Sequence, residues 1–166
     1  MTEFSRPVAL DRLAPGETVY DIAADPGERA ALARRFALVA LERLEARVRL
    51  MRLAGELVRL SADLSAEVAQ ECVVSLEKLT SRVEESFTLL YAEGQDASSE
   101  VVLSGAAELV EPVEGGVIDI GEAVAQQLSL ALDPFPRAAG TEAPEGATST
   151  AGVSPFAALS RWKQKD

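Results

Sequence analysis

The residue types that most often carry out chemistry in proteins are scarce in this chain. It contains no histidine and a single cysteine, Cys72. Without an imidazole, a Ser-His-Asp triad is excluded, and the commonest general base and metal ligand are missing. One cysteine can form neither an intramolecular disulfide nor a thiolate cage for a metal. No glycine fingerprint for phosphate or dinucleotide binding occurs. We therefore expect a protein that is not an enzyme and that holds no metal and no cofactor.

The remaining reactive groups have simple structural explanations. Cys72 is expected to be a buried, inert thiol in a strand, because free cysteine is among the most buried residue types. Its acidic neighbour Glu71 gives no reason for a lowered thiol pKa. Glu84 and Glu85 are adjacent on a predicted strand, so their side chains point to opposite faces and cannot act together as acid and base.

Basic residues are concentrated in one part of an acidic chain. The formal net charge is −11, which argues against a general nucleic-acid-binding protein. A local arginine patch can nevertheless contact phosphates, and such contacts make binding salt-dependent. The alternative, which spacing alone does not separate, is a solvated face paired to Glu42, Glu45 and Glu56. The candidate RNA contacts are Arg47, Arg49, Arg52 and Arg59 on a predicted hairpin, with Arg34 and Arg35 as additional contacts.

Hydrophobic periodicity predicts an α+β fold with a central antiparallel sheet of about four or more strands. The longest feature is a β-hairpin over 41–64, in which apolar and polar residues alternate. Asp25 and Asp119 are predicted to cap two helices that pack against the sheet. The segment 94–116 is acidic and is expected to be irregular. The predicted strands cover residues 7–10, 18–23, 44–51, 58–64, 68–76 and 83–91, with a turn at 78–81.

The chain divides into one α+β domain over 1–137, a flexible linker over 138–153 and a short amphipathic helix over 154–166. Phe156, Leu159 and Trp162 fall on one side of this helix. The helix either docks on its own domain or anchors a partner, and docking is favoured because a lone short helix is unstable. No secretory signal and no apolar run of membrane-spanning length occurs, so a cytoplasmic protein is expected.

Several stretches carry a resemblance through their order and spacing rather than through one decisive motif. They are residues 28–36 leading into 41–46, 70–76 followed by 83–87, 118–128 ending in 130–136, and the tail 154–159. This order resembles the YceD family, the bacterial large-ribosomal-RNA-subunit accumulation proteins, in its alphaproteobacterial form. The resemblance implies a role in the accumulation or processing of 23S rRNA and no known catalytic activity. It carries over no set of binding residues.

The chain departs from the family at one point. Many members resemble a metal-binding pattern, with Cys-x-x-Cys in the strand and more cysteines after the C-terminal helix. Here Ser75 stands at the second position of that pair, and residues 134–137 contain no cysteine. The metal site of such relatives is therefore expected to be absent from this chain.

Two functional hypotheses follow, and neither involves a membrane or DNA. The first is a ribosome-biogenesis factor that binds large-subunit rRNA or its precursor through the arginines. Replacement of the hairpin arginines by serine is then expected to weaken RNA binding and to flatten its salt dependence. The second is an acidic adaptor or chaperone for a basic ribosomal protein or assembly factor, steered by charge complementarity. The carboxylates that would matter in it are Glu84, Glu93, Glu108, Glu111 and Glu114.

Overall fold

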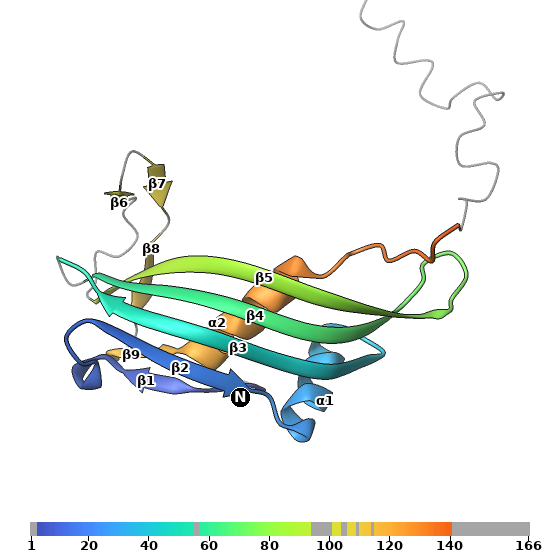
Figure 1. Cartoon of the computed structure of the whole chain (residues 1–166), viewed down its shortest axis with the longest axis horizontal. Helices are drawn as coiled ribbons and strands as arrows, with labels where there is room; N and C mark the ends of the chain where they lie inside the picture. Colours follow the sequence, from blue (N-terminus) through green and yellow to red (C-terminus); the bar gives the residue numbers. More distant parts are fainter. Residues whose placement is uncertain are drawn as a thin grey trace, which may run out of the picture.

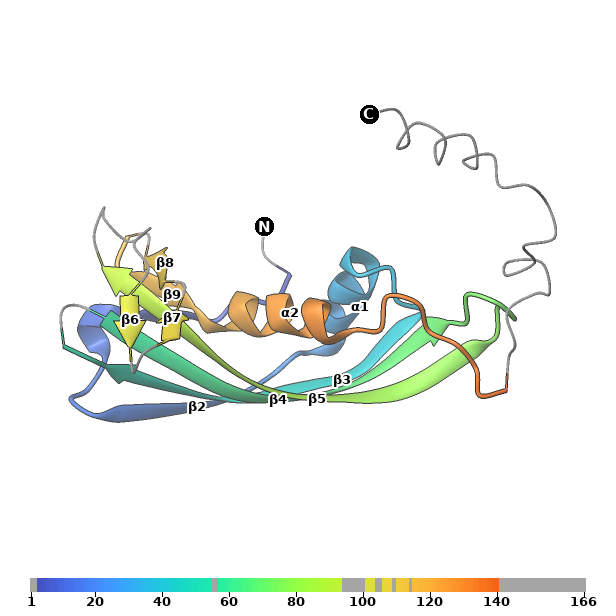
Figure 2. The same cartoon turned by 90° about the horizontal axis from the view of Figure 1, so that it is seen from above.

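One long, curved β-sheet, with helices on its concave side, organises the part of the chain that the structure describes (Figure 1 and Figure 2). This computed structural model describes residues 3–54, 57–93, 101–103, 106–108, 110–113 and 115–140. The strands are β1 (Pro7–Ala9), β2 (Glu17–Ala23), β3 (Ala40–Arg52), β4 (Leu57–Glu71), β5 (Lys78–Glu93), β6 (Val101–Leu103), β7 (Ala106–Glu108), β8 (Val110–Val113) and β9 (Val117–Asp119). The helices are the 3-10 turn η1 (Leu10–Arg12), α1 (Pro26–Arg35) and α2 (Ile120–Ala131).

The main sheet has the strand order β2-β3-β4-β5-β8. Strands β2 to β5 are antiparallel neighbours, as predicted, but β8 pairs in parallel with β5, so the sheet is mixed. This strand lies within 94–116, where the prediction of irregular structure is wrong in part. Two further short strands, β6 and β7, pair with each other in the same segment. The short β8 carries Pro112, which an edge strand tolerates because one side of its backbone has no ladder to complete.

The predicted strands 58–64 and 68–76 do not exist as separate elements. They belong partly to one strand, β4, whose partners run without interruption from Leu57 to Glu71. The turn follows at residues 72–77 rather than at the predicted 78–81. It closes with hydrogen bonds from Cys72 N to the Glu77 carbonyl at 2.8 Å and from Leu76 N to the Cys72 carbonyl at 3.0 Å. Val74 and Leu76 continue the alternation that ends at the buried Cys72, but their own side chains are exposed.

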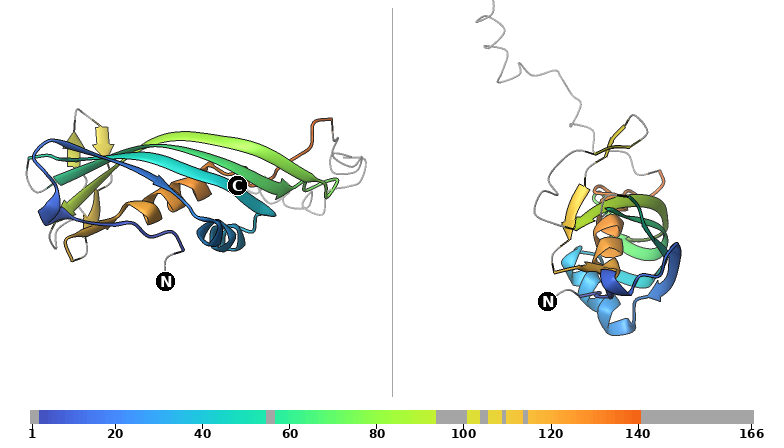
Figure 3. Two further views of the ribbon diagram at one scale, coloured as in Figure 1. Left: turned by 60° about the horizontal axis from the view of Figure 1, so that its bottom comes forward. Right: turned by 90° about the vertical axis from the view of Figure 1, so that its left-hand side faces the viewer.

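Strict alternation along β3 and β4 builds the core. The side chains of Leu44, Val48 and Leu50 on β3 are buried, as are those at positions 58 to 68 that share their face. A β-bulge between Leu41 and Arg43 shifts the register, so that Leu41 and Leu44 both point inward. Helix α2 covers this face, and Figure 3 shows it lying along the sheet with α1 near one end. The helical core residues are Leu32 and Ala33 of α1 and Ile120, Ala123, Val124, Ala125 and Leu128 of α2.

Both predicted helix caps are confirmed. Asp25 makes only local hydrogen bonds, whereas Asp119 also binds residues that are distant in the sequence. Asp25 and Glu28 form a reciprocal capping box at the start of α1. Asp119 accepts hydrogen bonds from the backbone N–H groups of residues 121 and 122, both at 3.1 Å. It also accepts hydrogen bonds from the Ser5 hydroxyl at 2.5 Å and from the Arg6 backbone at 2.7 Å. Asp119 therefore joins the N-terminal segment to α2.

This difference predicts unequal losses of stability. Asp25→Ala removes a local cap and is expected to lower the free energy of unfolding by about 1 kcal/mol. Asp119→Ala removes a cap and also leaves the Ser5 hydroxyl and the Arg6 amide without their acceptor, so a loss of about 2–3 kcal/mol is expected. Urea unfolding followed by circular dichroism measures both. Equal losses in the two variants would contradict the long-range role of Asp119.

Candidate functional site

The convex face of the sheet, which α1 and α2 leave uncovered, is polar. We call the outward-facing side chains of β2, β3, β4 and β5 the outer face. The strand register aligns Asp21, Arg47, Asp63 and Ser86 across the four strands. A second aligned row contains Val19, Arg49, Ser61 and Thr88. Alternation thus gathers on one surface charged and hydroxyl groups that are up to about seventy positions apart in the chain.

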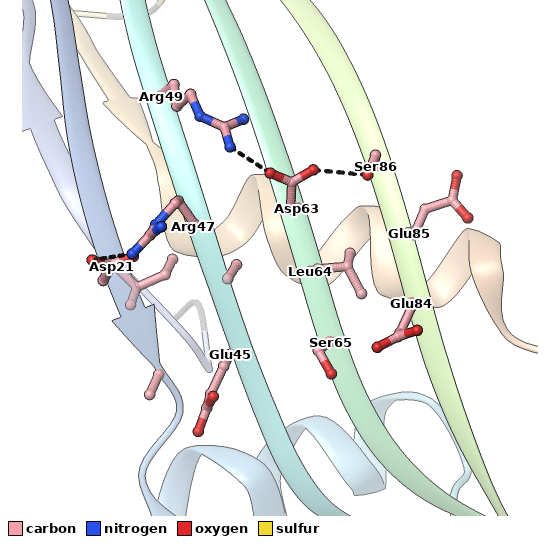
Figure 4. A pocket seen from close by; sticks show the side chains of 13 residues that line it. Asp21, Glu45, Arg47, Arg49, Asp63, Leu64, Ser65, Glu84, Glu85 and Ser86 are labelled. Carbon is pink, nitrogen blue, oxygen red and sulfur yellow. Dashed lines mark hydrogen bonds and ion pairs between the residues drawn. The ribbon is translucent and has the colours of Figure 1, made fainter.

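The central arginines of the outer face are already bound to carboxylates (Figure 4). Arg47 Nε donates to Asp21 Oδ1 at 2.7 Å, and this hydrogen bond lowers the pKa of Asp21. Arg49 donates to Asp63 at 2.6 Å. The Ser86 hydroxyl also donates to Asp63, at 2.8 Å, and the hydrogen bonds from Ser86 and Arg49 lower the pKa of this carboxyl. Both carboxylates therefore stay ionised over the physiological pH range.

The neighbouring charges of the outer face are paired in the same way. Arg43 binds Glu45 at 2.6 Å along β3, and Arg82 binds Glu84 at 2.6 Å along β5. Among the described residues, Arg59 on this face has no acidic partner within ion-pair distance. The outer face is therefore a mosaic of both signs rather than a basic patch.

A shallow depression of about 750 Å³ lies in the middle of the outer face. Two guanidinium groups line it, those of Arg47 and Arg49, and each of them is held by a carboxylate. Four carboxylates of the outer face line the same depression, so acidic groups outnumber basic ones among its lining side chains. The carboxylates are those of Asp21, Glu45, Asp63 and Glu84.

The six candidate arginines do not form one patch. Arg47, Arg49 and Arg59 share the outer face, whereas Arg52 donates to the Leu10 carbonyl of the 3-10 turn. Arg34 and Arg35 lie in the last turn of α1.

Arg35 is held in place by two acids. It binds Glu122 of α2 at 2.7 Å and Glu3 at 3.1 Å. The hydrogen bond to Glu122 raises the Arg35 pKa. Arg35 therefore has a structural task, which is to join the N-terminal segment and α1 to α2.

The sequence left open a solvated face on which the arginines pair with nearby glutamates. The arginines of the outer face are paired, but mostly with other acids than those predicted. The acids that hold Arg47 and Arg49 are Asp21 and Asp63, and neither was singled out from the sequence. The sequence does place both aspartates on the outer face, because each occupies an outward position in the alternation of its strand. Of the three predicted partners, Glu45 binds Arg43, Glu42 lies 3.9 Å from Lys78, and Glu56 is outside the described residues.

The acids proposed for an adaptor are also scattered. Glu84 lies on the outer face, and Glu111 lies on the edge strand β8. Glu114 and the side chains of Glu93 and Glu108 are outside the described residues.

Cys72 departs from the expectation of an unperturbed thiol in a strand. It is fully buried but opens the 72–77 turn. The backbone N–H groups of Ser75 and Ala138 donate to Sγ at 3.3 and 3.4 Å. Hydrogen bonds from Ser75, and then from Ala138, lower the pKa of the thiol to about 6. Val73 N also donates to the Pro136 carbonyl at 2.9 Å, so this turn is fastened to the chain that follows α2.

Comparison with protein-family models matches residues 60–160 to the family described as large ribosomal RNA subunit accumulation protein YceD. This chain belongs to the YceD family. No curated protein and no solved structure matches it. The YceD match begins after all six candidate arginines and includes Cys72, α2 and most of the tail.

Two further features of this YceD family member concern metal binding and membranes. Within the described residues, no three histidine, cysteine, aspartate or glutamate side chains are grouped so that they could hold a metal ion. None of the helices in the same part of the chain combines the length and the apolar character needed to cross a membrane. The tail residues Phe156, Leu159 and Trp162 are outside the described residues.

The Cys72 environment predicts a pH-dependent contribution to stability. The thiol has a pKa of about 6 in the fold against 9.0 as its ordinary value. Its contribution is therefore fully present above about pH 9 and is lost as the pH falls towards 6. We expect the difference in unfolding free energy between the parent protein and Cys72→Ser to grow from pH 6 to pH 9, measured by urea unfolding. Val74→Ser, in the same turn, should show a pH-independent difference, and a flat profile for Cys72→Ser contradicts the assignment.

Proposed function

We propose that this YceD family member is a non-enzymatic factor in large-subunit rRNA accumulation. In this proposal its outer face binds a basic segment of a ribosomal protein or assembly factor. The observation that carries the proposal is the depression on the outer face, where four carboxylates stand against two guanidinium groups that are already paired. The family description supplies the biological setting.

The charge balance favours a basic partner over a phosphate backbone. A phosphate that approached Arg47 or Arg49 would have to displace Asp21 or Asp63. Each displaced carboxylate would stay beside the phosphate and repel it. The ion pairs themselves are exposed and contribute only about 0–1 kcal/mol each, so they hinder phosphate binding less than the remaining negative charge does. The net charge of −11 also steers a basic partner towards the protein and an RNA away from it.

The side chains of the outer face support the same choice. Serine and threonine hydroxyls lie between the charges, and Ser61 and Thr88 are within 3.3 Å of each other. The outward positions of β2 to β5 hold no aromatic residue in the described part of the chain. Proteins that bind single-stranded RNA on a sheet commonly stack bases on aromatic side chains. The outer face offers hydrogen bonds and salt bridges instead.

A second candidate function is direct contact with large-subunit rRNA. Arg59 favours it, because this arginine lies on the outer face without an acidic partner among the described residues. In this case Arg47 and Arg49 would exchange their carboxylates for phosphates, with Arg59 as the first contact.

The two candidates predict opposite effects of one variant. In Arg47→Ser/Arg49→Ser, Asp21 and Asp63 lose their cations and become free to bind a basic partner. Affinity for a basic protein segment should then rise by about threefold, which corresponds to the small strength of exposed ion pairs. Affinity for RNA should instead fall by about tenfold or more, with a flatter salt dependence.

The partner is first recovered from cells by pull-down after ultraviolet crosslinking, with one half of the sample treated with nuclease. Binding of each recovered partner to the parent and variant proteins is then measured by titration at two salt concentrations. Arg12→Ser/Arg137→Ser removes the same charge from exposed positions off the outer face and serves as the control. A partner that survives nuclease and binds the double variant more tightly supports the proposal. Crosslinked rRNA that binds it more weakly replaces the proposal with the second candidate.

A further inference from the structure

The end of the sheet at which β4 turns into β5 exposes apolar side chains. Leu76 is 68% exposed and Phe135 is 69% exposed. Most of the large hydrophobic side chains that the described residues expose lie here. We call this group the apolar end, and it consists of Val39, Val73, Val74, Leu76 and Phe135.

Hydrogen bonds to backbone carbonyls bring these residues together from three parts of the chain. Val73 N donates to the Pro136 carbonyl at 2.9 Å, which places the turn beside Phe135. Val39 N donates to the Ala69 carbonyl at 2.8 Å, next to the start of the turn. The Gln70 side chain donates to the Asp133 carbonyl at 2.9 Å. The apolar end is therefore a fixed surface rather than a set of separate loop residues.

The turn keeps apolar side chains exposed to solvent, although burial of such side chains is favourable. Leu76 has a φ of 60°, in the left-handed region that a leucine rarely adopts. A large aliphatic side chain left in water forgoes the favourable free energy of burial. Contiguous exposed apolar groups of this kind mark surfaces that another segment covers.

We propose that the apolar end is the docking site for the chain's own C-terminal segment, residues 154–166, through Phe156, Leu159 and Trp162. Their spacing puts all three on one side of the predicted helix, which matches a receptor that is apolar and one-sided. This proposal concerns a different surface from the outer face and does not rest on the proposed function.

The point at which the chain leaves the described fold supports docking in cis. The last described residue is Gly140, two positions after Ala138, whose N–H donates to Cys72 Sγ at 3.4 Å. The chain therefore departs from beside the apolar end itself. The composition of residues 141–153 predicts a flexible linker, and a linker of this length has a root-mean-square span of about 20 Å, which is enough to fold back. Such a short tether gives an effective concentration on the order of millimolar.

Charge complementarity points to the same occupant. The C-terminal segment carries Arg161, Lys163 and Lys165 against the single acid Asp166. The exposed acids around the apolar end are Glu71, Glu77 and Asp133, and they outnumber the exposed bases there, which are Lys78 and Arg137. An apolar contact with a rim of opposite charges gives the docked helix both affinity and orientation.

Trp162 is the only tryptophan of the chain, so its fluorescence reports the docking directly. In the full-length protein we expect a blue-shifted emission and slow quenching by acrylamide compared with the same chain unfolded in urea. Both should be independent of protein concentration over a dilution series. A Trp162 that emits and is quenched in the native protein as in urea overturns the proposal, and so does shielding that disappears on dilution, which indicates a second copy instead.

Substitutions in the apolar end test whether the C-terminal segment docks there. Phe135→Ser and Leu76→Asn change exposed side chains, and asparagine tolerates the left-handed backbone at position 76. Each should shift the Trp162 emission towards that of the unfolded chain and speed its quenching, while far-ultraviolet circular dichroism stays unchanged. Val19→Ser is the matched control, because Val19 is an exposed apolar residue on the outer face. Shielding of Trp162 that persists in both receptor variants overturns the assignment to the apolar end.

Discussion

The alternation of side chains along two long strands is the constraint on which the rest of this structure depends. Strands β3 and β4 keep one phase over most of their length, so that their inward positions are buried and their outward positions are polar. A slip of one residue would exchange the two faces, because side chains on a strand repeat every two positions. The bulge between Leu41 and Arg43 is consistent with this constraint. The register shifts there, and Leu41 and Leu44 both remain buried. The core and the outer face therefore have one common cause.

A single strand pair does not close a core, and the N-terminal segment completes it. Phe4 is fully buried, and α2 approaches it so closely that a side chain at Gly121 would stand 2.6 Å from the Phe4 carbonyl oxygen. Ion pairs between Arg6 and Glu28 and between Arg35 and Glu122 join this segment and α2 to α1. These charged side chains therefore stabilise the packing of the helices. For this reason Arg35 is poorly suited to contact a phosphate.

Local signals predicted the parts of this fold that depend on nearby residues. The capping box at Asp25, the cap at Asp119 and the alternating phase of the hairpin all follow from residues within a few positions of one another. The 72–77 turn was misplaced because its valines and leucine continue a strand pattern, and only the backbone hydrogen bonds to Glu77 and Pro136 reveal that they do not pair. Partners of the arginines were missed for a related reason. Asp21 meets Arg47 only through the register of β2 on β3, which no local pattern encodes.

The outer face shows how a strongly acidic protein can present arginines without forming a basic patch. Each central guanidinium lies directly across from, or diagonal to, a carboxylate on a neighbouring strand, at the spacing where opposite charges attract. The resulting pairs are weak in water, because exposed ion pairs are largely offset by solvation and side-chain entropy. Such weak pairs cost little free energy to rearrange when another charged group approaches. In the proposed function, the excess of carboxylates that remains in the depression would favour a basic protein segment over a phosphate backbone.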